Sequence, residues 1–196
     1  MLDFSSYFSL GVLGLISGAS QFELGRSILG RHYRKIFIFS IIAIFSWQVF
    51  LALAQYKLWS ASPLTQLLLP PHQGIDYFLS FVISRLFLPY LISLAIALFM
   101  IFLLPRLNKK FDERFFETEE PYFAALAVFL VGHPGWLIYL VVLISLYLIL
   151  HTAYFILRRE AVRLSPYRLW GATALFVILI NEYWLSQTNW WSRLGV

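Results

Sequence analysis

The chain has 196 residues, of which 60% are apolar and only 13% are charged. A soluble domain is typically about 45–50% apolar and about 25% charged, so this composition excludes an ordinary cytosolic protein, a disordered chain and a nucleic-acid-binding domain. The net charge of +5 suits loops beside anionic lipid, and the lack of cysteine excludes disulfides and thiolate metal sites.

The apolar stretches predict an all-α, polytopic helical bundle of about six transmembrane helices. The whole chain, 1–196, is expected to form a single membrane domain. A spanning helix needs about 20 apolar residues, so the first and fourth helices are short for a full crossing. In the first one, Gly11, Gly14 and Gly18 predict close packing against a neighbouring helix. The expected helices, in chain order, cover 4–20, 36–56, 77–104, 115–132, 135–157 and 168–187.

The apolar stretch 121–157 is too long for one crossing. As a single helix it would measure about 55 Å at 1.5 Å per residue, against a hydrocarbon core of about 30 Å. The run Gly-His-Pro-Gly at 132–135 interrupts it, and Pro134 disfavours helix at the residue before it. We therefore predict a tight turn between two antiparallel helices. The first arm must either borrow residues from Phe115 onward or dip into the membrane without crossing it.

Basic residues gather in three segments, 21–35, 105–120 and 158–168, which hold twelve of the fifteen lysines and arginines. The positive-inside rule places such loops in the cytoplasm. A hairpin within 121–157 puts all three segments on one side, whereas a single crossing would separate them. We therefore expect a multi-pass protein of the cell membrane with cytoplasmic basic loops and with both termini outside.

Two charged residues lie inside predicted helices. Arg85 falls within the third helix, and Glu182 lies near the outer end of the last one, beside Asn181. A charge at such depth is costly and faces a partner or water. We predict an intramembrane polar pair of Arg85 and Glu182, serving either as a substrate or ion site or as an ion pair that fixes helix packing. The other alternative is that Arg85 snorkels outward to the membrane surface. Pro89, four residues after Arg85, predicts a kink.

Glu119, Glu120 and His151 are the candidates for catalysis. The two glutamates precede Pro121 at the start of the hairpin, where acidic residues and proline suit the first turn of a helix without any catalytic role. His151, on the second arm, would approach them across the hairpin, and such a group suits a metal ion or a proton relay. The alternative is an interior histidine with a satisfied hydrogen bond. We predict no metal and no cofactor, and we assign no catalytic set.

Two segments, Glu-Glu-Pro-Tyr-Phe-Ala-Ala-Leu-Ala at 119–127 and Leu-Ser-Pro-Tyr-Arg-Leu-Trp-Gly-Ala at 164–172, resemble type IV prepilin peptidases. The resemblance covers 119–175 and implies the same helical hairpin, cytoplasmic loop and last helix of small residues. The family's catalytic Asp position is held by Glu119 and its Lys position by Pro121, and the preceding glycines are missing. An aspartic protease needs two carboxylates that share a proton. The resemblance therefore implies the family's membrane scaffold without its protease chemistry.

Three functions remain open. The first, which the missing catalytic set favours, is a non-catalytic prepilin-peptidase-like scaffold or assembly component. The second is a small membrane transporter, or a transporter subunit, that uses Arg85 and Glu182. The third is a membrane-embedded peptidase-like enzyme that uses Glu119, Glu120 and His151. The expected partners are the lipid bilayer and other membrane proteins or a second copy of the chain, and not nucleic acid.

Overall fold

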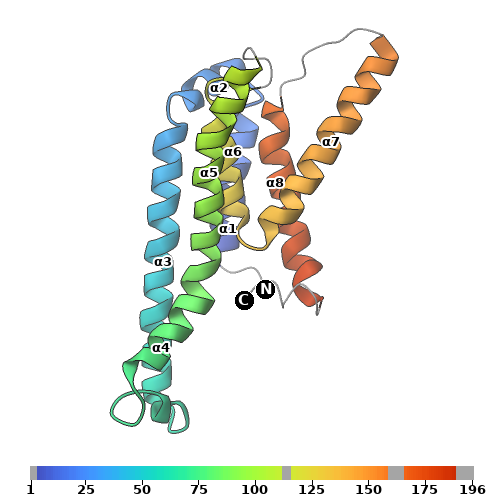
Figure 1. The fold of residues 1–196 in the computed structure, drawn as a ribbon. Coiled ribbons are helices and arrows are strands. Elements are labelled where there is room, and N and C mark those ends of the chain that lie inside the picture. Colours follow the sequence, from blue (N-terminus) through green and yellow to red (C-terminus); the bar gives the residue numbers. More distant parts are fainter. Residues whose placement is uncertain (1–3, 112–115, 159–165, 189–196) are drawn as a thin grey trace.

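The computed structural model describes residues 4–111, 116–158 and 166–188, and every regular element in these ranges is a helix (Figure 1). The predicted all-α bundle is therefore confirmed. The elements are α1 (Phe4–Ala19), α2 (Glu23–Gly30), α3 (Tyr33–Ala61), η1 (Thr65–Leu68), α4 (Ile75–Val82), η2 (Ile83–Phe87), α5 (Leu88–Lys110), α6 (Glu120–Val131), α7 (Gly135–Arg158), α8 (Tyr167–Tyr183) and η3 (Leu185–Gln187).

Within the described ranges, three helical segments are long and apolar enough to cross a membrane: Tyr33–Ala61, Ile75–Lys110 and Gly135–Leu157. α1 and α6 are apolar but shorter. The 12 residues of α6 measure about 18 Å at 1.5 Å per residue. α2 and η1 were not expected from the sequence, α3 extends beyond 36–56 at both ends, and α8 ends before the predicted 187. The central part of the third basic segment, 159–165, lies outside the described residues.

α6 is the central helix of the bundle. Every side chain from Phe123 to Val131 is buried, and α1, α3, α5, α7 and α8 all contact this helix (Figure 1). A helix that is apolar on all sides is a core helix. Ala124, Ala125 and Ala127 are small enough to let the neighbouring backbones approach closely. The residues at the two ends of α6, Glu120 and Val131, are therefore surrounded by other side chains of the protein.

α6 begins at Glu120, later than the predicted 115. Asn108, in the last turns of α5, holds the segment just before α6 in a non-helical conformation. Its Nδ2 donates to the Phe116 carbonyl at 2.7 Å, and the Phe116 N–H donates to its Oδ1 at 3.0 Å. Pro121 then occupies the first turn, where its missing N–H needs no partner. The expectation that the short arm borrows residues from Phe115 onward is wrong, although residue 115 itself lies outside the described ranges.

The chain reverses direction between Val131 and Gly135, where the sequence predicts a turn. Gly132 has a φ of 75°, a left-handed conformation that glycine adopts without strain. The Trp136 N–H donates to the Gly132 carbonyl at 2.9 Å, and Trp136 Nε1 donates to His133 Nδ1 at 3.1 Å. These bonds tie the turn to the start of α7.

α4, η2 and α5 form one continuous helical segment that is longer than the predicted 77–104. A π turn, Ile83–Phe87, interrupts it, and Arg85 is the middle residue of that turn. Pro89 has no N–H to donate to the carbonyl four residues earlier, so the helical hydrogen-bond pattern must shift there. The irregularity expected around Arg85 and Pro89 therefore takes the form of a π turn.

α7 diverges from the bundle as it runs away from the turn (Figure 1). Only 6% of its most apolar stretch is buried, against 22% for α3. Its large buried side chains, Tyr139 and Leu143, both belong to the half nearer the turn. The remaining half exposes an apolar surface.

α1 and α8 approach each other closely at Gly171 of α8, and not at the glycines of α1. A Cβ added to Gly11, Gly14 or Gly18 would meet no atom within 4 Å, so the close packing predicted there is wrong. A Cβ on Gly171 of α8 would stand 1.9 Å from Ser17 Oγ of α1. α1 packs through a different face, whose buried residues are Ser5, Ser9, Leu13 and Ile16.

Candidate functional site

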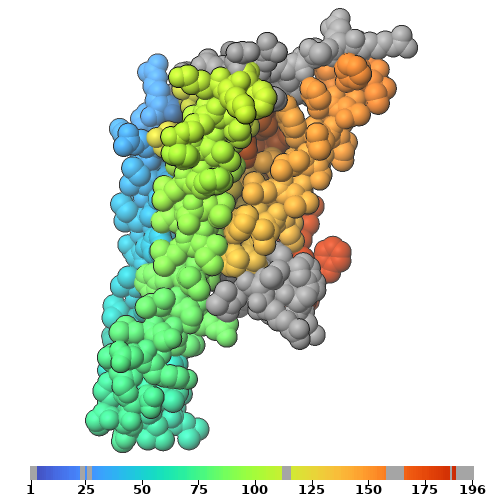
Figure 2. All heavy atoms as spheres, viewed as in Figure 1, coloured from blue at the N-terminus to red at the C-terminus, as the bar shows by residue number. Residues whose placement is uncertain are grey.

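An apolar groove opens along the side of the bundle where α7 diverges from α8. Its volume is about 140 Å³. Figure 2 shows the recess between α5 and α7, with atoms of α8 behind it. We call it the lateral groove, and its lining residues are Phe116, Leu143, Ile144, Tyr147, Pro166 and Trp170.

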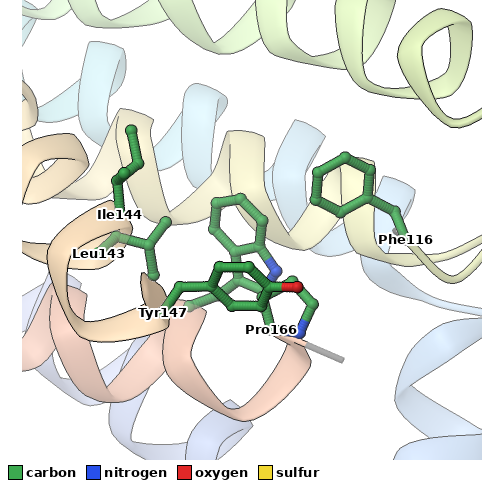
Figure 3. Close-up of a pocket in the computed structure, with 6 residues that line it drawn as sticks. Phe116, Leu143, Ile144, Tyr147 and Pro166 are labelled. Atoms are coloured by element: carbon green, nitrogen blue, oxygen red, sulfur yellow. The ribbon is translucent and has the colours of Figure 1, made fainter. Parts of the chain in front are cut away.

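The lining side chains come from three segments that are far apart in the sequence (Figure 3). Leu143, Ile144 and Tyr147 lie on one face of α7, because residues three and four positions apart share a helix face. Phe116 lies across the groove from them, and its ring centroid is 6.3 Å from that of Trp170. The groove is therefore a mainly apolar and aromatic surface whose width depends on the angle of α7.

Trp170 connects the lateral groove to the buried carboxylate of Glu120. Its Nε1 donates to Glu120 Oε2 at 3.4 Å, and the Glu120 side chain is 0% exposed. The Tyr139 hydroxyl donates to the Trp170 carbonyl at 3.2 Å. Glu120 is the first residue of α6, so the positive end of the helix dipole favours its negative charge. These contacts give the carboxylate a structural role at the junction of α6 and α8.

Three buried aromatic residues hold α3, α6 and α8 together beside this carboxylate. The hydroxyl groups of Tyr33 and Tyr167 are hydrogen-bonded to each other. The Phe123 ring stacks on Tyr33 at a centroid distance of 5.1 Å and lies 5.6 Å from Tyr167. Phe123 follows Glu120 by three positions and therefore shares its face of α6. Glu120 thus lies next to a closely packed aromatic cluster.

The other two catalytic candidates lie elsewhere. The carboxylate of Glu119 contacts α2, where a Cβ on Gly30 would stand 1.7 Å from its Oε2. His151 is exposed on the diverging half of α7 and stacks on Tyr147 at a centroid distance of 5.9 Å.

Among the residues that the structure describes, no three His, Cys, Asp or Glu side chains form a group that could hold a metal ion. The hypothesis that His151 joins both Glu119 and Glu120 in one group across the hairpin is therefore wrong. The alternative of an interior histidine is wrong as well, because His151 is exposed. The reason is the course of α7, which leaves α6 progressively after the turn.

Glu182 lines a second, polar cavity beside the hairpin turn, which we call the turn cavity. Its Oε2 accepts a hydrogen bond from Ser6 Oγ at 3.3 Å. Arg85 is exposed in η2, one turn before Pro89, and is not among the described residues that line the cavity. The pair of Arg85 and Glu182 stays a prediction. The turn cavity brings Asn181 and Glu182 together with α1, the start of α5 and the end of α6. Its lining residues are Ser5, Ser6, Ser9, Pro89, Tyr90, Leu130, Val131, Gly132, His133, Ile178, Asn181 and Glu182.

Sequence reasoning missed Trp170 and Tyr147 as site residues. Both carried a detectable signal, because aromatic residues recur at helical spacing at Tyr167 and Trp170 and again at Tyr147 and His151.

Comparison with protein-family models, with curated proteins and with solved structures finds no match to this chain.

Proposed function

We propose that the chain is a non-catalytic scaffold or assembly component of the cell membrane that holds an apolar transmembrane segment of another protein in the lateral groove. The observation that carries the proposal is the divergence of α7, a helix of which only 6% of the most apolar stretch is buried, beside a groove lined by Trp170 and Tyr147.

The positions of the carboxylates support a role without catalysis. Glu120 is 0% exposed and accepts from Trp170, and Glu119 packs on α2. A catalytic acid or base must come within hydrogen-bond distance of its substrate, whereas Glu120 is enclosed by protein. The scaffold that the resemblance to prepilin peptidases implies, without their catalytic Asp, agrees with this reading.

A transmembrane helix suits the lateral groove better than a soluble ligand does. The lining is almost wholly apolar, so it offers few hydrogen-bonding groups for orienting a polar small molecule. Aromatic and branched aliphatic side chains give the packing contacts through which helices associate in lipid. Leu143 and Ile144 would pack against such a helix from one side, and Phe116 from the other.

A photo-crosslinking residue introduced at Ile144 tests this function. We expect crosslinks in intact membranes to apolar segments of a specific membrane protein, which mass spectrometry of the adduct identifies. Ile149 is the matched control, because it is 62% exposed on the opposite face of α7. Adducts with lipid alone at Ile144, or the same protein adducts at both positions, would contradict the proposal.

The proposed orientation places the basic loops in the cytoplasm and both termini outside. The chain contains no cysteine, so one introduced cysteine is the only site of labelling. A membrane-impermeant maleimide added to intact cells should label Leu64→Cys, which lies in the α3–α4 loop and is 81% exposed. Lys109→Cys lies in the last turn of α5, at the end that is remote from the α3–α4 loop. It should react only after the membrane is opened. Labelling of Lys109→Cys in intact cells would reverse the orientation.

A further inference from the structure

An apolar strip that ends in two basic residues runs along one exposed face of α5. α5 lies on the surface of the molecule (Figure 2), and the side chains of Leu98 and Phe102 are 52% and 56% exposed. The helix packs on the bundle through a different face, which includes Ala97 and Leu104. The residues of the exposed face follow one another at intervals of three and four positions and therefore share one side of the helix. We call this face the α5 strip, and it consists of Leu98, Ile101, Phe102, Pro105, Arg106 and Lys109.

The α5 strip has the length and the polarity of one half of a bilayer. The helix rises about 17 Å from Leu98 to Lys109 at 1.5 Å per residue. One leaflet contributes about 15 Å to a hydrocarbon core of about 30 Å. The strip begins with Leu98, Ile101 and Phe102, and Arg106 and Lys109 lie in the last turns of the helix. An acyl chain beside the apolar residues would therefore bring its phosphate group to the two cations.

A polar pocket continues the strip beyond its basic end. Its volume is about 350 Å³, which is the space of about ten water molecules at about 30 Å³ each. Pro105 and Lys109 line both the strip and this pocket, so the two surfaces are contiguous. The pocket is therefore large enough for the phosphate and the glycerol of a lipid headgroup. Its lining residues are Pro105, Asn108, Lys109, Phe116, Glu117, Thr118 and Pro121.

Arg106 and Lys109 have N–H groups to offer an anion. Arg106 Nη1 donates to the Phe102 carbonyl at 3.1 Å, and its guanidinium carbon lies 3.0 Å from the centroid of the Phe102 ring. These contacts hold the guanidinium at the edge of the apolar residues, and most of its five N–H donors remain for a ligand. Lys109 makes no hydrogen bond or ion pair with any residue that the structure describes. Asn108 and Glu117 already have partners of their own.

We propose that the α5 strip and the polar pocket bind one anionic phospholipid, with its phosphate between Arg106 and Lys109 and one acyl chain along Leu98 and Phe102. Charged N–H donors form strong hydrogen bonds with phosphate oxygens, and arginine suits this group best. A zwitterionic lipid offers the same acyl chains and phosphate, but its positive headgroup charge would face two cations. The proposal does not require that the lateral groove holds another protein.

The test is the thermal stability of the full chain in detergent micelles, titrated with phosphatidylglycerol, with phosphatidylcholine of the same acyl chains, or with inorganic phosphate. An ionic strength of about 0.5 M screens the diffuse attraction between surface charges and lipid. We expect a saturable rise in Tm with phosphatidylglycerol alone. Arg106→Gln and Lys109→Gln should each raise the midpoint concentration about tenfold, because each removes a charged hydrogen bond to the phosphate.

Lys110→Gln is the matched control. Lys110 is exposed, follows Lys109 directly and is not among the described residues that line the strip or the pocket. Its substitution removes the same charge from the same end of α5, and we expect the midpoint of the parent chain. An equal shift in Lys110→Gln would mean that only the total charge matters, and would overturn the proposal. So would no rise with phosphatidylglycerol, or an equal rise with phosphatidylcholine or with inorganic phosphate. If Arg106→Gln does not fold, Lys109→Gln against Lys110→Gln decides the question.

Discussion

Gly171→Leu is expected to lower the free energy of unfolding by about 3 kcal/mol, the upper part of the range for overpacked cores. A Cβ at this position would stand 1.9 Å from Ser17 Oγ and 3.0 Å from Phe123 Cζ. Rotation about χ1 would move the Ser17 Oγ, but the Ser17 Cβ would still stand 3.2 Å away, and Phe123 is stacked on Tyr33. α1 and α8 would have to separate, and the aromatic cluster beside Glu120 would loosen with them.

Gly11→Leu is the control for the added side chain itself. A Cβ on Gly11 would meet no atom within 4 Å, and the residue is exposed on α1. Its effect should stay within about 0.5 kcal/mol, as for surface substitutions generally. The measurement is unfolding of each variant in detergent micelles, followed by tryptophan fluorescence. Equal losses in the two variants would mean that Gly171 does not mark a close approach between helices.

The contrast between Gly171 and the α1 glycines shows which part of the packing could be predicted from the sequence. Small residues at helical spacing indicate that a close approach is feasible, and Gly11, Gly14 and Gly18 have that spacing. Whether they face a neighbour depends on the rotation of α1 in the bundle. That rotation is set by the opposite face, which includes Leu13 and Ile16 and packs on other helices.

The hairpin was predictable because two independent quantities required it. The length of 121–157 exceeds one crossing, and the basic segments share one side if the chain turns at 132–135. The exact start of α6 was not predictable. It depends on hydrogen bonds between Asn108 and Phe116 across the α5–α6 connection. The sequence shows a polar residue near the end of a helix, but it does not show which backbone group that residue will bond.

The lateral groove itself was not predicted from the sequence, although one residue next to it was singled out as a weak catalytic candidate. Glu120 was selected because it precedes an apolar helix, and it lies buried beside the lateral groove. Trp170 was missed: its spacing from Tyr167 marks an aromatic helix face, but the bond to Glu120 follows from the packing of α8 against α6. His151 was assigned to the same site because the two arms of an ideal hairpin stay in contact. α7 diverges instead, and it moves away from α6 along its length after the turn.

Glu120→Ala is the other substitution with a large expected effect, a loss of about 3 kcal/mol. The Trp170 Nε1–H would lose its acceptor, which costs about 1–3 kcal/mol for a buried donor, and the missing side chain would leave a cavity in a fully packed region. Glu120→Gln keeps an acceptor oxygen for Trp170 and the side-chain volume, so we expect it to lose less than Glu120→Ala does. Chemical unfolding in micelles measures both values.

A double-mutant cycle separates the hydrogen bond from the packing. Trp170→Phe removes the donor of this hydrogen bond. In Glu120→Ala the indole N–H has lost its acceptor, and Trp170→Phe removes that N–H as well. We therefore expect Trp170→Phe to lower the free energy of unfolding less in the Glu120→Ala background than in the parent chain. If Glu120→Gln also keeps the crosslinks expected at Ile144, the protein does not need the negative charge of Glu120. A folded Glu120→Gln variant that loses its crosslinks or its cellular role would instead assign chemistry to this carboxylate. The enzyme hypothesis would then replace the scaffold.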